Sequence, residues 1–239
     1  MIEYFGPGDH HAGFIGFQVL GTVDGHLYKK MFSTRKAGSQ SSDDPLVQWR
    51  FLCAMEQGLT WRIEAEEVRY RKLVSENHHL TLPHRGVGVR CLTASFVPAG
   101  NSDDAWAPCF LVARHRDELG RRQGPKRFHF KTALFSEAWR EAVHFWADEH
   151  TVFDEDRDRV LATPPSPGQF SALRRQMNSE GRDIPTEALE PVFREQRMRL
   201  AKARASSEDT TAIEDALAQE LTEWQSRPRP IDGRRRGAN

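Results

Sequence analysis

The chain has 239 residues and a mass of 27.4 kDa, with 38% hydrophobic and 28% charged residues and a mean hydropathy of −0.66. This length allows one large or two small domains, and the polar composition favours small cores with a solvated segment. No apolar run approaches the roughly 20 residues of a membrane span, and no signal peptide is recognisable. Three cysteines without a C-x-x-C motif argue against a disulfide framework or zinc ribbon, so we expect a reducing cytoplasm.

Basic and acidic residues balance at 34 each, yet they are segregated along the chain. Residues 10–37 have four Lys or Arg and one Asp, whereas residues 38–82 have five basic and seven acidic residues. Residues 84–131 have nine basic and four acidic residues, whereas residues 132–163 have three and eight. A basic stretch therefore precedes an acidic one twice. This pattern predicts units with one positive face that steers a polyanion despite the neutral total.

Residues 1–82 are predicted to form a first, degenerate sheet-plus-helix unit. The runs 17–23 and 26–32 flank Asp24-Gly25, which is a strong hairpin signal, and a shorter strand is expected near Phe14. A helix is predicted from Pro45 to about Val74, with Gly58 as its weak point. Its apolar residues recur at spacings of three or four: Trp49, Leu52, Met55, Leu59 and Ile63. We interpret Trp49 as a core residue.

Residues 83–163 are predicted to form a second unit of the same design. Strands are expected at 86–96, 106–113 and 126–131, with a turn at 101–104. Alternation in the third strand puts Phe128 and Phe130 on one face and Arg127, His129 and Lys131 on the other. A helix is expected over 135–146, with Ser136 as its N-cap. Its apolar stripe comprises Ala138, Trp139, Ala142, Val143 and Trp146.

The two units align without a gap over nine residues, 30–38 on 126–134. Each predicted helix then contains a Trp-Arg pair, at Trp49-Arg50 and Trp139-Arg140. We interpret this as an internal duplication.

The second unit resembles the plant ethylene-response-factor (APETALA-type) DNA-binding domain and its bacterial and phage relatives. The matching residues are Gly88-Val89-Arg90, Trp106-Ala107, the basic strand 126–131, and Glu137-Ala138 with Ala142. The resemblance implies a three-stranded sheet lying in the DNA major groove with the helix packed behind it. It implies that Arg90, Trp106, Arg127, His129 and Lys131 face DNA. The link from His115 to Pro125 is longer than in that family, and the first unit has no Gly-Val-Arg.

The full predicted DNA interface adds basic residues near these strands. A ribbon of strands can enter the major groove, where Lys and Arg neutralise phosphates and Arg grips guanine. The predicted DNA-binding residues are Arg90, Trp106, Arg114, Lys126, Arg127, His129 and Lys131 in the second unit, and Lys29, Lys30 and Arg35 in the first. The open alternative is that the basic strand is simply a solvated face.

Residues 164–239 differ in kind from the two units. Residues 163–168 read as a linker, followed by helical patterns at about 168–179, 186–205 and 208–225 and a basic tail. Apolar residues are sparse in these helices. We therefore expect them to dock on the main body, on a second copy or on a protein partner.

No catalytic or metal-binding set is found in the sequence. The paired histidines His10-His11 and His78-His79 have no further ligands at a finger-like spacing. Nucleotide-binding and hydrolase motifs are missing as well. We therefore expect neither an enzyme nor a bound metal or cofactor.

These patterns together predict an α+β protein of two tandem units, each a three-stranded antiparallel sheet plus a helix, with a helical C-terminal extension. The predicted function is binding of double-stranded DNA, as a regulator or a phage or mobile-element accessory factor in the cytoplasm at the nucleoid. The alternative is a non-enzymatic adaptor or inhibitor that binds an acidic protein through the same faces. No membrane association is expected.

Overall fold

The computed structural model describes residues 1–37, 40–99, 106–116, 119–130 and 133–226; in the last helix, side chains are described up to residue 205 and at 217–219. Two three-stranded antiparallel sheets, each followed by a helix, make this an α+β protein, which confirms the predicted fold class. The first unit contains β1 (Ile2–Phe5), β2 (Gly16–Val23), β3 (His26–Ser33) and α1 (Pro45–Ser75). The second begins with β4 (Leu92–Pro98), β5 (Trp106–Val112), β6 (Lys126–His129) and α2 (Phe135–His150).

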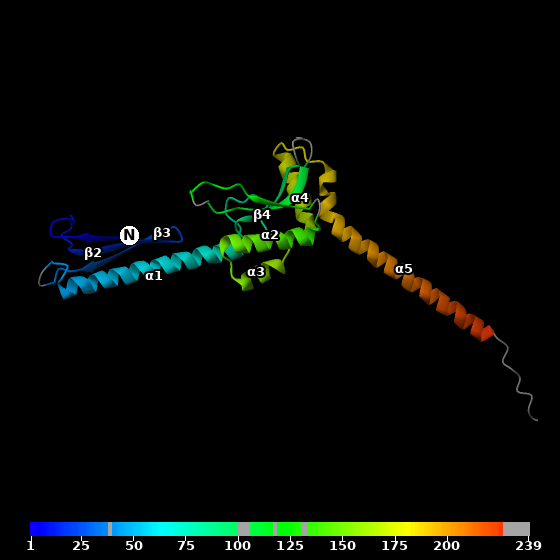
Figure 1. Ribbon diagram of the computed structural model, residues 1–239, viewed down its shortest axis with the longest axis horizontal. Coiled ribbons are helices and arrows are strands. Elements are labelled where there is room, and N and C mark those ends of the chain that lie inside the picture. The colour runs from blue at the N-terminus through cyan, green and yellow to red at the C-terminus, as the bar shows by residue number, and fades with distance from the viewer. Residues whose placement is uncertain (38–39, 100–105, 117–118, 131–132, 227–239) are drawn as a thin grey trace, which may run out of the picture.

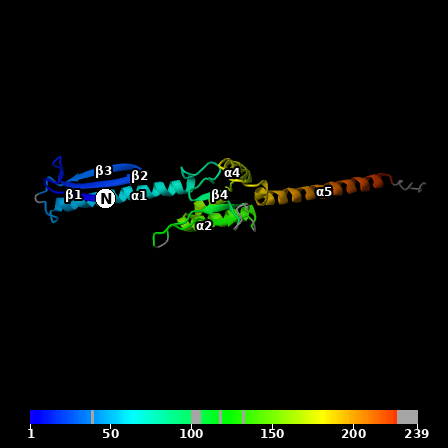
Figure 2. The same cartoon turned by 90° about the horizontal axis from the view of Figure 1, so that it is seen from above.

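Further helices follow the second sheet: α3 (Asp154–Leu161), α4 (Pro167–Ser179), a short 3-10 helix (Thr186–Leu189) and α5 (Glu190–Ser226). The two helices expected at 186–205 and 208–225 are thus largely one continuous helix. In Figures 1 and 2 the molecule is elongated, with the first sheet along the N-terminal part of α1 and α5 projecting from the opposite end.

The first sheet is ordered β1-β2-β3. Its hairpin turn at Asp24-Gly25 has positive φ at both residues, 50° and 80°, as a two-residue turn of this type requires. The edge strand, however, is residues 2–5 and not the region of Phe14, so that expectation is wrong. Gly13 and Gly16 both adopt positive φ, and the loop that they shape returns the chain so that Ile2 pairs with Val19.

Helix α1 packs on the first sheet through small residues. Asp44 caps its N-terminus, because its carboxylate accepts a 2.9 Å hydrogen bond from the Leu46 N–H. The buried residues along the sheet include Ala54 and Ala65, and Gly58 lies against Val19 and Ile2. Trp49 is exposed, so its prediction as a core residue is wrong. The sheet approaches α1 most closely at these small residues, and Phe51 and Trp61 of the helix pack beside them, against Phe17 and Tyr28 of the sheet.

The second unit has an aromatic core. The Phe110 ring lies 5.0–5.9 Å from four other rings: Phe130, Phe135, Trp139 and Phe170. All five residues of the predicted α2 stripe are buried, as expected. The helix begins at Phe135, with Leu134 at the N-cap position, two residues before the predicted cap Ser136. The Leu134 N–H is satisfied by the Glu137 carboxylate at 2.9 Å, which makes a serine cap unnecessary.

The strand expected at 86–96 is shorter in the structure and begins at Leu92. Cys91 adopts a φ of 67°, in the left-handed region that interrupts an extended chain. Val89 reaches the core, with 3% of its surface exposed. Residues 86–91 therefore approach the sheet as a turn.

The core of the second unit extends beyond residue 163. Ser166 caps α4, which then buries Phe170, Leu173 and Met177 among the side chains of the second sheet and α2. Ile184 and Val192 belong to the same cluster. The region expected to be a linker is thus a short connection between α3 and α4, and the body that surrounds the second sheet includes residues up to the start of α5.

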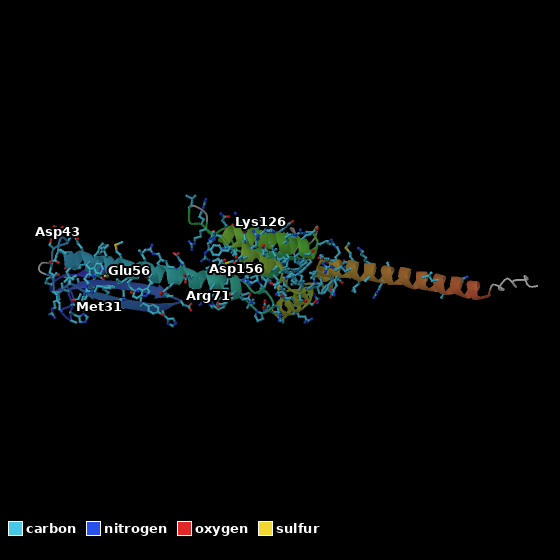
Figure 3. All side chains as sticks on the ribbon, turned by 90° about the horizontal axis from the view of Figure 1, so that it is seen from below. Met31, Asp43, Glu56, Arg71, Lys126 and Asp156 are labelled. Carbon is cyan, nitrogen blue, oxygen red and sulfur yellow. The ribbon has the colours of Figure 1, made fainter. Side chains whose placement is uncertain are left out.

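Helix α1 connects the two units, because its C-terminal residue Val74 is buried in the second core. The Tyr70 hydroxyl donates a 2.7 Å hydrogen bond to the Asp156 carboxylate of α3. Arg159 donates a 2.7 Å bond to the Val74 carbonyl. Figure 3 shows Asp156 beside the C-terminal part of α1. These contacts couple α1 to the second unit through buried and polar groups together.

One contact recurs in both sheets at positions that the repeat alignment pairs. The Lys30 ammonium lies 5.5 Å from the Phe32 ring centroid in β3, and the Lys126 ammonium lies 5.3 Å from the Phe128 centroid in β6. Both pairs occur in the third strand of their sheet. This shared geometry supports the interpretation of an internal duplication.

Candidate nucleic-acid interface

The most concentrated positive charge in the second unit lies on the hairpin between β5 and β6. The strands pair from Val112 with Lys126 to Cys109 with His129, and an isolated bridge joins Arg116 to Arg122 farther out. In Figure 1 this green hairpin projects from the second sheet toward the end where the first sheet lies. We call its described residues, 113–116 and 119–127, the basic arm. Its cationic side chains are all exposed: Arg114, Arg116, Arg121, Arg122, Lys126 and Arg127.

Most of these cations are not neutralised within the described residues. Arg114, Arg122 and Arg127 form no ion pair with any residue that the structure describes. Arg116 donates a 3.1 Å hydrogen bond to the Gly120 carbonyl, which stiffens the arm without cancelling its charge. A guanidinium group keeps its charge at any physiological pH and presents several donors in one plane. The arm therefore presents several charged guanidinium groups, each able to donate two hydrogen bonds to one anionic group of a partner.

Lys126 is placed differently from the arginines of the arm. Its ammonium lies 3.9 Å from the Phe145 ring centroid, in addition to its contact with Phe128. It also lines a hollow that includes the carboxylates of Glu141 and Asp148 from α2. Lys126 is thus held against aromatic rings and near acidic groups, so it is a weaker anion ligand than the arginines.

The base of the arm is clamped to α2 by two histidines. The Ala113 carbonyl can only accept, so His150 donates to it from Nε2 at 3.0 Å and its Nδ1 accepts. His115 then donates from Nε2 to that nitrogen at 3.1 Å, and its backbone N–H donates to Glu149 at 2.6 Å. Burial lowers the pKa of His150, as does the neighbouring His115 ring, against the opposite effects of the Ala113 bond and Glu149. The lowered pKa favours the neutral form of His150, in which Nε2–H donates to Ala113 and Nδ1 accepts from His115.

Among the described residues of the second sheet, the outer face carries positive charge only at β6. Arg127 pairs across to Leu111 and Thr93, and His129 pairs across to Cys109 and Ser95. Arg127 is exposed and His129 is half-buried, whereas Lys131 lies outside the described residues. Burial raises the pKa of the Cys109 thiol to about 12, which makes it an inert small residue. Most of this face is therefore uncharged.

Arg90 and Trp106 do not lie on this face. Arg90 precedes β4, and its guanidinium forms a 3.0 Å ion pair with Glu76 just beyond α1. Its carbonyl accepts a 2.9 Å bond from the Trp146 indole. Trp106 shares the inner side of β5 with Phe110, packs against the core, and has the Arg182 guanidinium 6.0 Å from its ring centroid. Neither side chain is available to bases beside Arg127.

The three predicted residues of the first unit are scattered. The Lys30 ammonium donates a 2.5 Å hydrogen bond to Gln57 of α1, so it lies on the helix side of the sheet. Lys29 alternates to the outer face, and Arg35 lies beyond the end of β3. The first unit therefore does not gather its cations into one surface.

A groove of about 860 Å³ lies between α2, the α3–α4 connection and the start of α5. Its floor includes Phe135, Trp139 and Val192. The Glu195 carboxylate fills its polar end and accepts a 3.0 Å bond from the Ser136 N–H. Although burial alone would raise the pKa of Glu195, this bond and the Arg199 charge together lower it. The anion-binding end of α2 is thus occupied by the chain itself.

Three residues of the arm, Arg116, Arg121 and Arg122, were missed as site residues by sequence reasoning. The signal was the basic composition of the unusually long link between β5 and β6, which carries charge where a short turn would suffice. No group of three His, Cys, Asp or Glu residues in the described part of the chain could hold a metal ion. In the same part of the chain, every helix is too short or too polar to cross a membrane.

Comparison of the chain with protein families, with curated proteins and with solved structures finds no match.

Proposed function

We propose that this chain binds double-stranded DNA through the basic arm, in a regulatory and non-catalytic role. The observation that carries the proposal is the exposure of Arg114, Arg122 and Arg127 on one projecting hairpin, without an ion pair among the described residues. Leaving such charges exposed and close together costs self-repulsion. An anionic partner relieves that repulsion, and a polyanion does so at several positions at once.

The shape of the arm supports duplex DNA as that partner. Two paired strands lie about 4.8 Å apart, and the major groove, about 12 Å wide, admits a two-stranded ribbon. Guanidinium groups bind phosphate oxygens in pairs and also match the O6 and N7 acceptors of guanine. The predominantly uncharged outer face of the sheet supports a contact led by the arm and not by the sheet.

Most of the binding free energy in this proposal comes from phosphate contacts. Such contacts release counterions, so affinity depends steeply on salt and only weakly on sequence. The arm is anchored by the histidine clamp, which holds its first residues against α2. The proposed complex therefore needs the arm in place as well as its charges.

The direct test measures fluorescence anisotropy of a labelled random-sequence duplex of about two helical turns. The double variant Arg114→Ala/Arg122→Ala should bind roughly tenfold or more weakly than the wild type at low salt. Arg71→Ala/Arg175→Ala is the matched control, because it removes two exposed arginines of α1 and α4 outside the arm. Equal losses in both double variants, or no loss in the arm variant, would overturn the proposal. Thermal melts verify that all three proteins are folded.

The alternative partner is an acidic protein, which would recognise the same charges. Poly-glutamate provides the charge without the duplex. If the partner is DNA, poly-glutamate should displace the duplex only when its negative charges greatly outnumber the phosphates of the duplex. Displacement at matched charge would favour an adaptor that binds acidic protein segments.

A further inference from the structure

The N-terminal half of α1 exposes a line of large apolar side chains. Trp49, Leu52, Leu59 and Ile63 have 60%, 58%, 46% and 57% of their surfaces exposed. We call these four residues the α1 stripe. They are four of the five residues whose spacing predicts the helix, and Trp49 among them was expected to be a core residue. The structure buries the opposite side of the helix instead.

Helical geometry explains this arrangement. At 3.6 residues per turn, Ala54, Gly58 and Ala65 lie along one side of α1, which is the side that meets β2. The α1 stripe lies about half a turn away from them. In Figure 1 the first sheet runs along one side of the N-terminal half of α1, and no other element runs along the opposite side. The chain's own α5 projects from the far end of the molecule and does not cover it.

The exposed area is large for a monomer. The four side chains together expose on the order of 400 Å² of apolar surface, in the range where a single patch on a soluble protein marks an interaction site. Closing two such stripes, with their flanking residues, buries roughly 1,000 Å² in total, which is the lower bound of a specific protein interface. One further helix of matching character is enough to cover it.

We infer that the α1 stripe is the dimer interface of this protein, with α1 of a second copy packed against it in antiparallel orientation. The position of Glu56 along the α1 stripe favours the antiparallel orientation of the two helices. Glu56 lies between Leu52 and Leu59 on the same side of the helix. A parallel pair would stack Glu56 on Glu56 of the second copy in an apolar seam, which is costly. An antiparallel pair aligns Leu52 with Ile63 of the second copy and Glu56 with Leu59 of the second copy.

The remaining geometry is compatible with this pairing. The first sheet covers the opposite side of α1, so each copy adds an outer sheet to a central pair of helices. The antiparallel direction sends the two second units to opposite ends, because each is attached at the C-terminal end of its own α1. The inference is independent of DNA binding and survives if that proposal fails.

Sedimentation of the full chain at micromolar concentrations tests the interface. The wild type should sediment at twice the 27.4 kDa chain mass, and Leu59→Glu should sediment at the single-chain mass. The matched control is Leu217→Glu, which charges a similarly exposed leucine of α5. A wild-type monomer, a dimeric Leu59→Glu protein, or a dimer lost only in Leu217→Glu would each overturn the inference. Circular dichroism should be unchanged in both variants, because neither leucine is buried.

Disulfide trapping tests the orientation. Leu52→Cys and Ile63→Cys are oxidised separately and after mixing, with the wild type as control for the native cysteines. The antiparallel pair predicts a covalent dimer only in the mixture, because identical positions lie well beyond disulfide reach in that arrangement. Covalent dimers in each variant alone would show a parallel pair and overturn the proposed orientation. A mixture without crosslinks would overturn it as well.

Discussion

The substitution Phe170→Ala tests whether α4 is part of the second core. Phe170 is fully buried, and its ring contacts Phe96, Phe110, Phe130 and Phe135 at centroid distances of 5.2–6.0 Å. Removing a buried phenylalanine ring costs its transfer free energy and leaves a cavity, together about 3–5 kcal/mol. That cost is comparable with a large part of the stability of a small domain. The second unit should therefore unfold at much lower denaturant concentration.

The assay is urea unfolding followed by tryptophan fluorescence, to which the buried Trp139 and Trp146 contribute. Met198→Ala, at an exposed position of α5, is the control and should lower the free energy of unfolding by less than about 0.5 kcal/mol. A loss below about 1 kcal/mol in Phe170→Ala would refute the packing of α4 in this core. The same reasoning predicts that a fragment of residues 84–150 is much less stable than the full chain, since it lacks α4.

Three further predictions follow from specific contacts. The pKa of His150 in the folded protein lies below its ordinary value of 6.5. The stability that neutral His150 contributes is therefore complete above pH 6.5 and declines as the pH falls toward the folded pKa. The melting temperature should drop on acidification, and it should drop less in His150→Gln. Gly21→Ala would place a methyl group 2.6 Å from a ring carbon of Trp61 and should lower the free energy of unfolding by about 1–3 kcal/mol. Gly124→Ala is the control, because its methyl group would meet no atom within 4 Å, and it should leave denaturant unfolding unchanged. Arg90→Ala should lower the free energy of unfolding by about 0.5–1 kcal/mol, because it removes the ion pair with Glu76. The affinity for duplex DNA, measured by anisotropy, should not change. A loss of base preference in this variant would show that Arg90 contacts DNA.

Local signals predict most of the fold. The Asp24-Gly25 turn, the alternation around Phe128 and Phe130, and the apolar stripe of α2 each depend on neighbours in sequence, and all are confirmed. Such features follow from turn chemistry and from the periods of strands and helices. The α+β class follows from their order.

The wrong predictions concern which side of a helix or strand packs against the rest of the protein. Periodicity identifies an apolar side of α1 but cannot tell whether that side meets the sheet or another molecule. The sheet instead packs on the side of α1 that carries Ala54, Gly58 and Ala65, so Trp49 and the rest of the α1 stripe remain exposed. The edge strand at residues 2–5 was missed for a related reason, since its pairing with β2 is set by a glycine-shaped loop.

The candidate site was only partly predictable. Alternation places Arg127 on the outer face, but the inward side of Trp106 and the turn at Cys91 depend on the register of β4 and β5 and on backbone conformation. The sequence indicated only that the link between β5 and β6 is rich in arginine. Their common exposure requires a projecting hairpin, which the length of the link alone does not establish.

The salt dependence of duplex affinity decides whether the arginines of the basic arm bind DNA phosphates. The observed binding constant is measured against salt concentration for the wild type and for a variant with Arg114, Arg116, Arg122 and Arg127 replaced by Ala. If these four side chains meet phosphates, the slope of the logarithmic plot becomes shallower by roughly 3–4 in the variant. DNA binding by the basic arm predicts that change together with a wild-type circular dichroism spectrum. Equal slopes in two folded proteins would contradict DNA binding by the basic arm.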